Sequence, residues 1–166
     1  AEEIRRAAGV PLGEPLARVD LDRVRARVAA LRRVESARVE RVWPGTLHVR
    51  VVERTPVAVA WIGPRAALVD RYGVVVEERS SAPLRLPRLR VDRLGVDDPA
   101  TRAALAVLTG LPPRLAERVE EVRAVSARSI VLRLADGRSV VWGGPERGDV
   151  KARIVLTLLA RSAGRA

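Results

Sequence analysis

The sequence predicts an α+β protein in two parts: a helix–helix–hairpin unit, then a larger unit with a mostly antiparallel sheet and flanking helices. Two patterns indicate this class. The spacing of apolar residues changes from a helical to a strand period near residue 37. An Asp-Gly pair at 136–137 joins two apolar runs, as in a tight β-hairpin. Hydrophobic residues make up 48% of the 166 residues, and with no Phe, Met or Cys the core must consist mostly of Val, Leu, Ile and Ala.

The first unit is expected to begin with two helices. Residues 2–8 form a short helix that Gly9 can end in the left-handed conformation. The second helix starts after Asp20, whose carboxylate can accept hydrogen bonds from the first-turn backbone N–H groups. Its apolar positions form one stripe, with arginines between them facing water. The stripe consists of Leu21, Val24, Val28 and Leu31.

Residues 37–54 are expected to form a β-hairpin. Apolar and other residues alternate at 47–51, as in a half-buried strand. Pro44 followed by Gly45 is the residue order of a type II turn. Trp43, the largest side chain of the hairpin, is expected to anchor it to the two helices.

The second unit combines short strands with two longer helices. One helix begins at Asp98-Pro99, a capping residue followed by proline at the first helical position, and ends at Gly110. A closing helix is expected at about 149–161. Strands are expected at 57–62, 66–69, 74–77, 119–125, 128–135 and 138–143.

The last two of these strands define a register. Pairing around the Asp-Gly turn places Leu132 opposite Val141. It also places Val131 opposite Trp142. Apolar side chains then lie on both faces, so this sheet is expected to be covered on both sides.

The formal net charge of +11 raises the question of nucleic-acid binding. However, the arginines are spread along the whole chain, Lys151 is the one lysine, and aromatic residues make up 2%. Single-stranded nucleic acid is bound on aromatic platforms that this composition barely offers. A solvated basic surface, or one that faces anionic envelope polymers, is therefore favoured over a nucleic-acid partner.

The sequence offers little for catalysis, a metal or a cofactor. His48 is the single histidine, with no nucleophile or orienting partner in the local sequence, and a surface histidine is the favoured interpretation. Zinc sites need three or four His, Cys or carboxylate ligands. The glycines at 143, 144 and 148 resemble a phosphate loop only superficially, because Lys151 is not followed by Ser or Thr. We expect no enzyme activity, no cofactor and no small-molecule substrate.

Several short motifs follow one another in a fixed order along the sequence. The central motif is RVWPGTL at 41–47, followed by VVERTPVA at 51–58. The others are AGVPLG at 8–13, LVDRYG at 68–73 and LPRL at 86–89. Together they resemble the FtsQ/DivIB family of bacterial cell-division proteins, and the Arg-, Ala- and Val-rich composition is typical of a high-GC bacterium. The resemblance gives structural roles to signature residues, namely Trp43, Pro44, Gly45, Glu53, Arg54, Pro56, Asp70, Gly73, Asp136 and Gly137. Of these, Glu53 and Arg54 are expected to form an exposed or inter-domain ion pair.

The resemblance implies a POTRA domain at 1–56 and the family's β domain at 57–166. POTRA domains have the order β-α-α-β-β, so the first strand is expected to be missing from this sequence. A final strand after the last helix is expected to be missing or truncated. The family's transmembrane helix would also lie outside the sequence, since no apolar run here reaches about 18 residues. The implied location is the cell membrane, single-pass, with this part on the extracytoplasmic side at the division septum.

The implied function is that of a non-catalytic scaffold that binds FtsB/DivIC-type and FtsL-type proteins by strand addition, and possible further partners are of the FtsK or FtsW/FtsI type. The resemblance points to Arg128 and Arg153 beside the edge of the β domain. It points to Val39 and Arg41 on the POTRA side. The alternative is a POTRA-containing factor for protein translocation or outer-envelope assembly, which would share only the first 56 residues.

Overall fold

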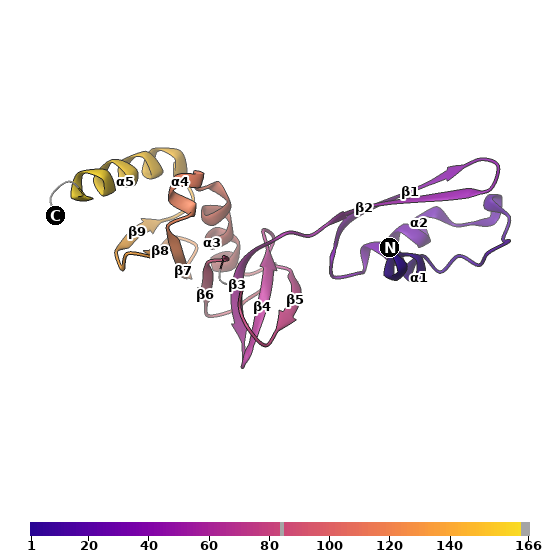
Figure 1. The fold of residues 1–166 in the computed structure, drawn as a ribbon, viewed down its shortest axis with the longest axis horizontal. Coiled ribbons are helices and arrows are strands. Elements are labelled where there is room, and N and C mark those ends of the chain that lie inside the picture. Colours follow the sequence, from indigo (N-terminus) through magenta and orange to yellow (C-terminus); the bar gives the residue numbers. More distant parts are fainter. Residues whose placement is uncertain (84, 164–166) are drawn as a thin grey trace. The chain divides into compact units, whose positions relative to one another are not determined.

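The computed structural model describes residues 1–83 and 85–163, and the chain divides into two compact units, Ala1–Arg54 and Thr55–Ala166. Figure 1 shows helices and strands in both units, and the sheets are mostly antiparallel, as the predicted α+β class requires. Within the described ranges, no helix is long and apolar enough to cross a membrane.

The first unit packs helices against a two-stranded antiparallel hairpin (Figure 1). Its elements are α1 (Glu2–Ala8), a 3-10 helix (Leu16–Arg18), α2 (Leu21–Ala29), β1 (Val34–Val42) and β2 (Thr46–Glu53). The predicted helix ends are confirmed. Gly9 ends α1 with φ 58°, and the Asp20 carboxylate accepts a hydrogen bond of 3.1 Å from the backbone N–H of Arg23. The buried face of α2 carries Val24 and Val28, which pack on the hairpin.

Two predictions about the hairpin turn are wrong. Trp43 is 68% exposed and so does not anchor the hairpin to the helices. Gly45 does not have the positive φ that a type II turn requires at its third residue, and the Trp43–Pro44 peptide bond is cis. Small apolar side chains in β1 and β2, including Val34 and Ala37, fill the space beneath the helices instead.

The second unit contains a seven-stranded sheet with the order β5-β4-β3-β6-β7-β8-β9. Strand β6 pairs parallel with both β3 and β7, and the other pairs are antiparallel. The strands are β3 (Pro56–Ile62), β4 (Arg65–Asp70), β5 (Val75–Arg79), β6 (Arg88–Val91), β7 (Val119–Ser126), β8 (Ser129–Leu134) and β9 (Ser139–Gly143).

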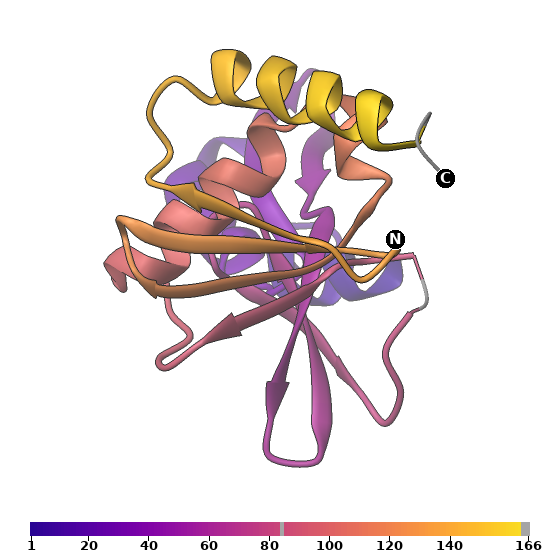
Figure 2. The ribbon, with the colours of Figure 1, turned by 90° about the vertical axis from the view of Figure 1, so that its left-hand side faces the viewer.

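Three helices and the sheet share the main core of this unit. The helices are α3 (Pro99–Gly110), α4 (Pro113–Ala116) and α5 (Gly148–Ala163). In Figure 2, α5 runs along one side of strands β8 and β9. Leu105, Leu115 and Leu132 are fully buried, so this core joins α3, α4 and the strands. The backbone N–H of Thr101 donates to the Asp98 carboxylate at 2.7 Å, which confirms the cap and lowers the pKa of Asp98.

The turn between β4 and β5 is built on two signature residues. The buried Asp70 carboxylate accepts hydrogen bonds from the backbone N–H groups of Tyr72 (2.9 Å) and Val74 (2.8 Å). Gly73 has φ 89°, which favours glycine, and lies against Gly95 and Thr101. This turn therefore connects the sheet to the loop before α3.

The predicted register of β8 and β9 is wrong by one residue near the turn. Leu132 pairs with Val140, and Val131 with Val141. The N–H of Leu134 donates to the carbonyl of Arg138, which leaves a three-residue loop in place of the two-residue one. A bulge between Ile130 and Val131 then shifts the pairing.

The expected burial of both faces of this sheet is also wrong. Val141 is 83% exposed and Val125 is 60% exposed.

Two elements of the second unit were missed. The four-residue strand β6 lies in a Pro- and Arg-rich stretch with no alternation long enough to recognise, and α4 begins at Pro113, where the pattern predicted only the end of α3.

Candidate partner-binding edges

The seven-stranded sheet has two edge strands, β5 and β9, and they differ in charge. Strand β5 ends in Glu77, Glu78 and Arg79. The Arg79 guanidinium donates to the Glu77 carboxylate at 3.0 Å, which raises the pKa of Arg79. Charged side chains along an edge discourage pairing with another strand. The charged side chains of β5 therefore disfavour the addition of another strand at this edge.

Edge β9 lacks this protection. Its residues are Ser139, Val140, Val141, Trp142 and Gly143, none of them charged. The side chain of Val141 is exposed, whereas that of Trp142 is 4% exposed and belongs to the core. One side of the strand backbone pairs with β8, and the other offers its N–H and C=O groups to a further strand.

The start of α5 fixes the end of β9. The Lys151 ammonium lies 5.8 Å from the Trp142 ring centroid and donates to the carbonyl of Gly144 at 2.8 Å. Both contacts hold the chain just after the strand. These contacts order the end of β9 within the free chain, which lowers the conformational entropy that the edge itself would lose when a strand binds.

Arg128 lies in the turn between β7 and β8, close to the end of β9. Ile130, two residues further along the chain, pairs with Gly143, the last residue of that strand. The side chain is exposed, and in the described part of the chain it forms no ion pair. The structure thus places an available positive charge beside the unprotected edge.

Arg153 occupies a different surface. It lies on the exposed side of α5 and pairs with Asp149 at 3.8 Å. It borders a shallow groove of about 350 Å³ whose other lining residues are Val150, Ile154, Thr157 and Leu158. Arg128 lies in the β7–β8 turn and Arg153 on α5, so the two arginines come from different elements.

The first unit has its own edge at β1. A groove of about 570 Å³ runs between this strand and the start of α2 and includes Val39 and Arg41 in its lining. Val39 is half-buried. The Arg41 guanidinium donates to the carbonyls of Leu16 (2.9 Å) and Val19 (2.6 Å), so it holds the loop before α2. Arg41 therefore has an internal role that the sequence pattern did not indicate.

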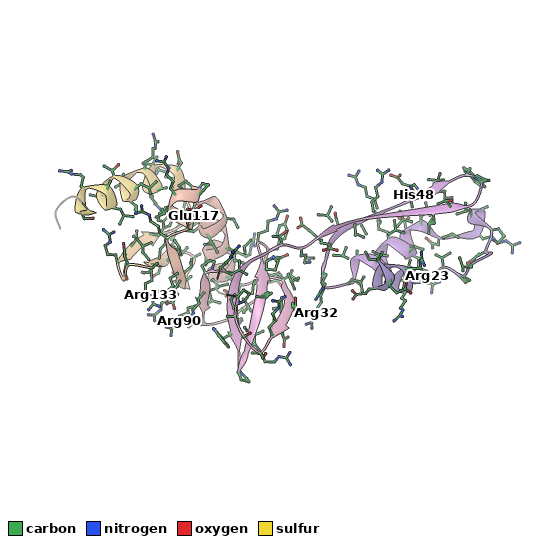
Figure 3. All side chains as sticks on the ribbon, viewed as in Figure 1. Arg23, Arg32, His48, Arg90, Glu117 and Arg133 are labelled. Carbon is green, nitrogen blue, oxygen red and sulfur yellow. The ribbon has the colours of Figure 1, made fainter. Side chains whose placement is uncertain are left out.

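The charged side chains are distributed over many elements. Figure 3 labels Arg23 on α2, Arg90 on β6 and Arg133 on β8, as well as His48 on β2. Arg133 pairs with Glu120 at 3.3 Å. His48 is exposed and lies opposite Glu40 in the hairpin. In the described part of the chain, no group of three or more His, Asp or Glu side chains could hold a metal ion.

Both units match models of one protein family. Residues 1–54 match the FtsQ-type POTRA domain, and residues 59–163 match the C-terminal part of the cell division protein FtsQ/DivIB. The chain belongs to the FtsQ/DivIB family. Its predicted family and fold class are confirmed, and the family's role is in cell division.

Curated relatives named cell division protein FtsQ are similar along almost the whole chain. That of Mycolicibacterium smegmatis is 48% identical over 160 residues, 96% of this chain and 48% of the relative. That of Mycobacterium tuberculosis is 44% identical, over 96% of this chain and 51% of the relative. That of Streptomyces venezuelae is 38% identical, over 95% and 61%. The chain thus spans about half the length of the mycobacterial relatives.

A solved structure of the major extracytoplasmic domain of DivIB from Geobacillus stearothermophilus is also similar. It is 18% identical, with a TM-score of 0.47, over 61% of this chain and 87% of that one.

The structure gives local roles to other signature residues of this FtsQ/DivIB chain. Pro56 opens β3. Asp136 accepts hydrogen bonds from the side chain and backbone N–H groups of Arg138, which lower the pKa of Asp136. Glu53 is exposed at the end of β2. Its predicted ion pair with Arg54 stays a prediction.

Sequence reasoning did not identify Val141 as an exposed residue of an edge strand. The available signal was the contrast between 75–79, which contains three charged residues, and 139–143, which contains none. That contrast marks an edge only after the strand order is known, and the sequence does not give the strand order.

Proposed function

We propose that this chain is the extracytoplasmic docking part of a membrane-anchored cell-division protein, and that β9 accepts a strand from FtsB/DivIC-type and FtsL-type partners. One observation carries the proposal: an uncharged edge strand, with Val141 83% exposed, lies beside the exposed Arg128. Strand addition gains affinity from main-chain hydrogen bonds and specificity from alternate side chains. An acidic residue in the partner strand would face Arg128.

The proposal also includes a second contact surface, which lies in the first unit. The groove beside β1 would receive other division proteins, of the FtsK or FtsW/FtsI type, at Val39. Arg41 would contribute by fixing the groove wall, because its guanidinium is bonded to backbone carbonyls of its own unit. Arg153 would belong to a separate contact on α5.

The proposed protein has a POTRA domain at 1–56 and a β domain at 57–166, a single membrane anchor outside this sequence and a location at the division septum. It acts as a non-catalytic scaffold. The alternative, a POTRA-containing translocation or envelope-assembly factor, is disfavoured because residues 59–163 match the C-terminal part of FtsQ/DivIB.

The test is a calorimetric titration with the extracytoplasmic parts of an FtsB/DivIC-type and an FtsL-type protein. It uses this chain and a version extended at its C-terminus. Val141→Lys places a charge on the edge strand, so we expect binding to weaken about tenfold or more. Arg128→Glu should weaken it several-fold and reduce its salt dependence.

Val125→Lys is the matched control. Val125 is 60% exposed and lies on β7, an interior strand that is paired on both sides, so the same substitution leaves both edges unchanged. Equal affinities for the two lysine variants would contradict strand addition at β9. If neither this chain nor its C-terminally extended version binds the partners although both are folded, the proposed site at β9 is wrong.

A further inference from the structure

Helix α3 has an unusual composition for a helix at a protein surface. Arg102 is its single charged residue among the 12 residues from Pro99 to Gly110. The apolar residues of its inner face, Ala104, Leu105 and Leu108, are buried in the core of the unit. A helix face in contact with water normally carries several charged side chains, and a helix that is apolar on most sides is normally covered. The outer face of α3 therefore has the composition of an interface.

A groove of about 710 Å³ lies along this outer face. Its floor is the α3 surface around Ala103 and Ala106. Tyr72, which is 49% exposed, contributes from the β4–β5 turn, and Val96, which is 45% exposed, from the loop before α3. Pro145, from the segment between β9 and α5, completes the lining. Side chains from three other segments of the second unit thus surround an α3 floor of small residues.

The charge of the groove has one sign. The charged residues in its lining are Arg71 and Arg102, and the described lining contains no carboxylate. The Arg71 guanidinium lies 5.0 Å from the Tyr72 ring centroid. Arg102 is exposed and makes no ion pair with any described residue. An occupant with acidic side chains would be complementary to this surface.

We propose that this groove docks an acidic amphipathic α-helix of a partner protein. A strand would gain little there, because the backbone groups of α3 are used within the helix and none of the described lining residues belongs to a strand. A helix fits the floor, since small side chains such as Ala103 and Ala106 permit a close interaxial distance of about 8 Å. Apolar residues of the incoming helix would contact Tyr72 and Val96, and its carboxylates would reach Arg102.

This site is separate from the β9 edge and does not depend on the strand-addition proposal. The probe for the test is a designed helical peptide of about 18 residues, long enough to be helical in solution. Its leucines follow the i, i+3, i+4, i+7 spacing and glutamates flank them. A second peptide carries lysine in place of each glutamate. Both are titrated into the whole isotope-labelled chain, and binding is followed by amide NMR shifts.

We expect the acidic peptide to shift the amides of Tyr72, Val96 and Ala106, with an affinity that falls as salt is added. The lysine peptide should shift none of them. Arg102→Ala should weaken binding several-fold. No shift with the acidic peptide, or shifts that map to α5 or β9, would overturn the proposal.

Ala106→Glu provides the sharper variant, because it fills the groove floor and adds a negative charge. We expect it to weaken binding about tenfold or more. The matched control is Ala160→Glu, the same change at an exposed position on α5 that lies outside the groove lining. Similar affinities for the two variants, both folded by circular dichroism, would refute the site. Self-association that Ala106→Glu abolishes would also refute it, because the occupant would then be a second copy.

Discussion

The three tryptophans of the chain differ in what they do. Trp142 is 4% exposed and packs in the core of the second unit, although its Nε1 has no hydrogen-bond partner among the described residues. Trp43 and Trp61 are exposed by half or more. Large aromatic side chains usually indicate a core, but only the structure distinguishes the buried one from the exposed ones.

The first prediction compares two of these residues. Trp142→Ala should lower the free energy of unfolding by about 3–5 kcal/mol, since it leaves a large cavity in the core. Trp43→Ala should lower it by less than about 1 kcal/mol, because the side chain is mostly in water. Chemical denaturation of the two variants and the parent protein measures both values.

Trp142→Phe is the control for the first variant. It keeps most of the apolar volume and removes an indole N–H that has no partner, so it should cost much less than Trp142→Ala. A large loss of stability in Trp43→Ala would mean that the hairpin tip has a packing role that its 68% exposure contradicts.

At the scale of elements, sequence patterns located helix ends better than strand pairings. Asp20 and Asp98 both cap helices as predicted, because a cap depends on residues three positions apart. The pairing of β8 with β9 was shifted, because it depends on whether the loop has two or three residues and on a distant bulge. Strand β6 was missed, since its place between β3 and β7 follows from tertiary pairing.

The second prediction concerns two glycines in turns with almost the same backbone conformation. Gly73 has φ 89° and Gly137 has φ 85°. Alanine at either position should cost about 1–2 kcal/mol for the left-handed conformation alone. At Gly73, a Cβ would also lie 3.2 Å from Thr101 Cγ2 and 3.3 Å from the Gly95 carbonyl oxygen. Gly73→Ala should therefore be the more destabilising variant, as measured by urea denaturation.

Gly137→Ala serves as the matched control because nothing lies within 4 Å of its added Cβ. Equal losses of stability would indicate that the loop at Gly95 moves away without cost. In that case the close approach between the β4–β5 turn and the start of α3 would not restrain this part of the unit.

For the whole molecule, the order of the motifs predicted two units and the family, whereas the candidate site could be predicted only in part. Arg128 was named from the resemblance and lies beside the β9 edge. Arg41 was named in the same way, but its guanidinium holds a loop of its own unit. Whether a surface arginine is available for a partner depends on nearby carbonyls and carboxylates that the sequence does not place.

The third prediction is that the two units differ in local stability. Among the described residues, the core of the first unit contains six buried apolar side chains, and the main core of the second contains twenty. The first unit has a sheet of two strands, and such sheets are marginal without added packing. The free energy of its local opening should therefore be the lower of the two.

Amide hydrogen exchange of the intact 166-residue chain measures this difference. Peptides that cover β1 and β2 (Val34–Val42 and Thr46–Glu53) should exchange faster than peptides that cover β7 and β8 (Val119–Ser126 and Ser129–Leu134). Low concentrations of urea should widen the gap, because the smaller unit would open first while the seven-stranded sheet stays folded. Equal protection at every urea concentration would mean that both units unfold in one cooperative step. A partner at the β1 edge would then bind a surface as rigid as β9.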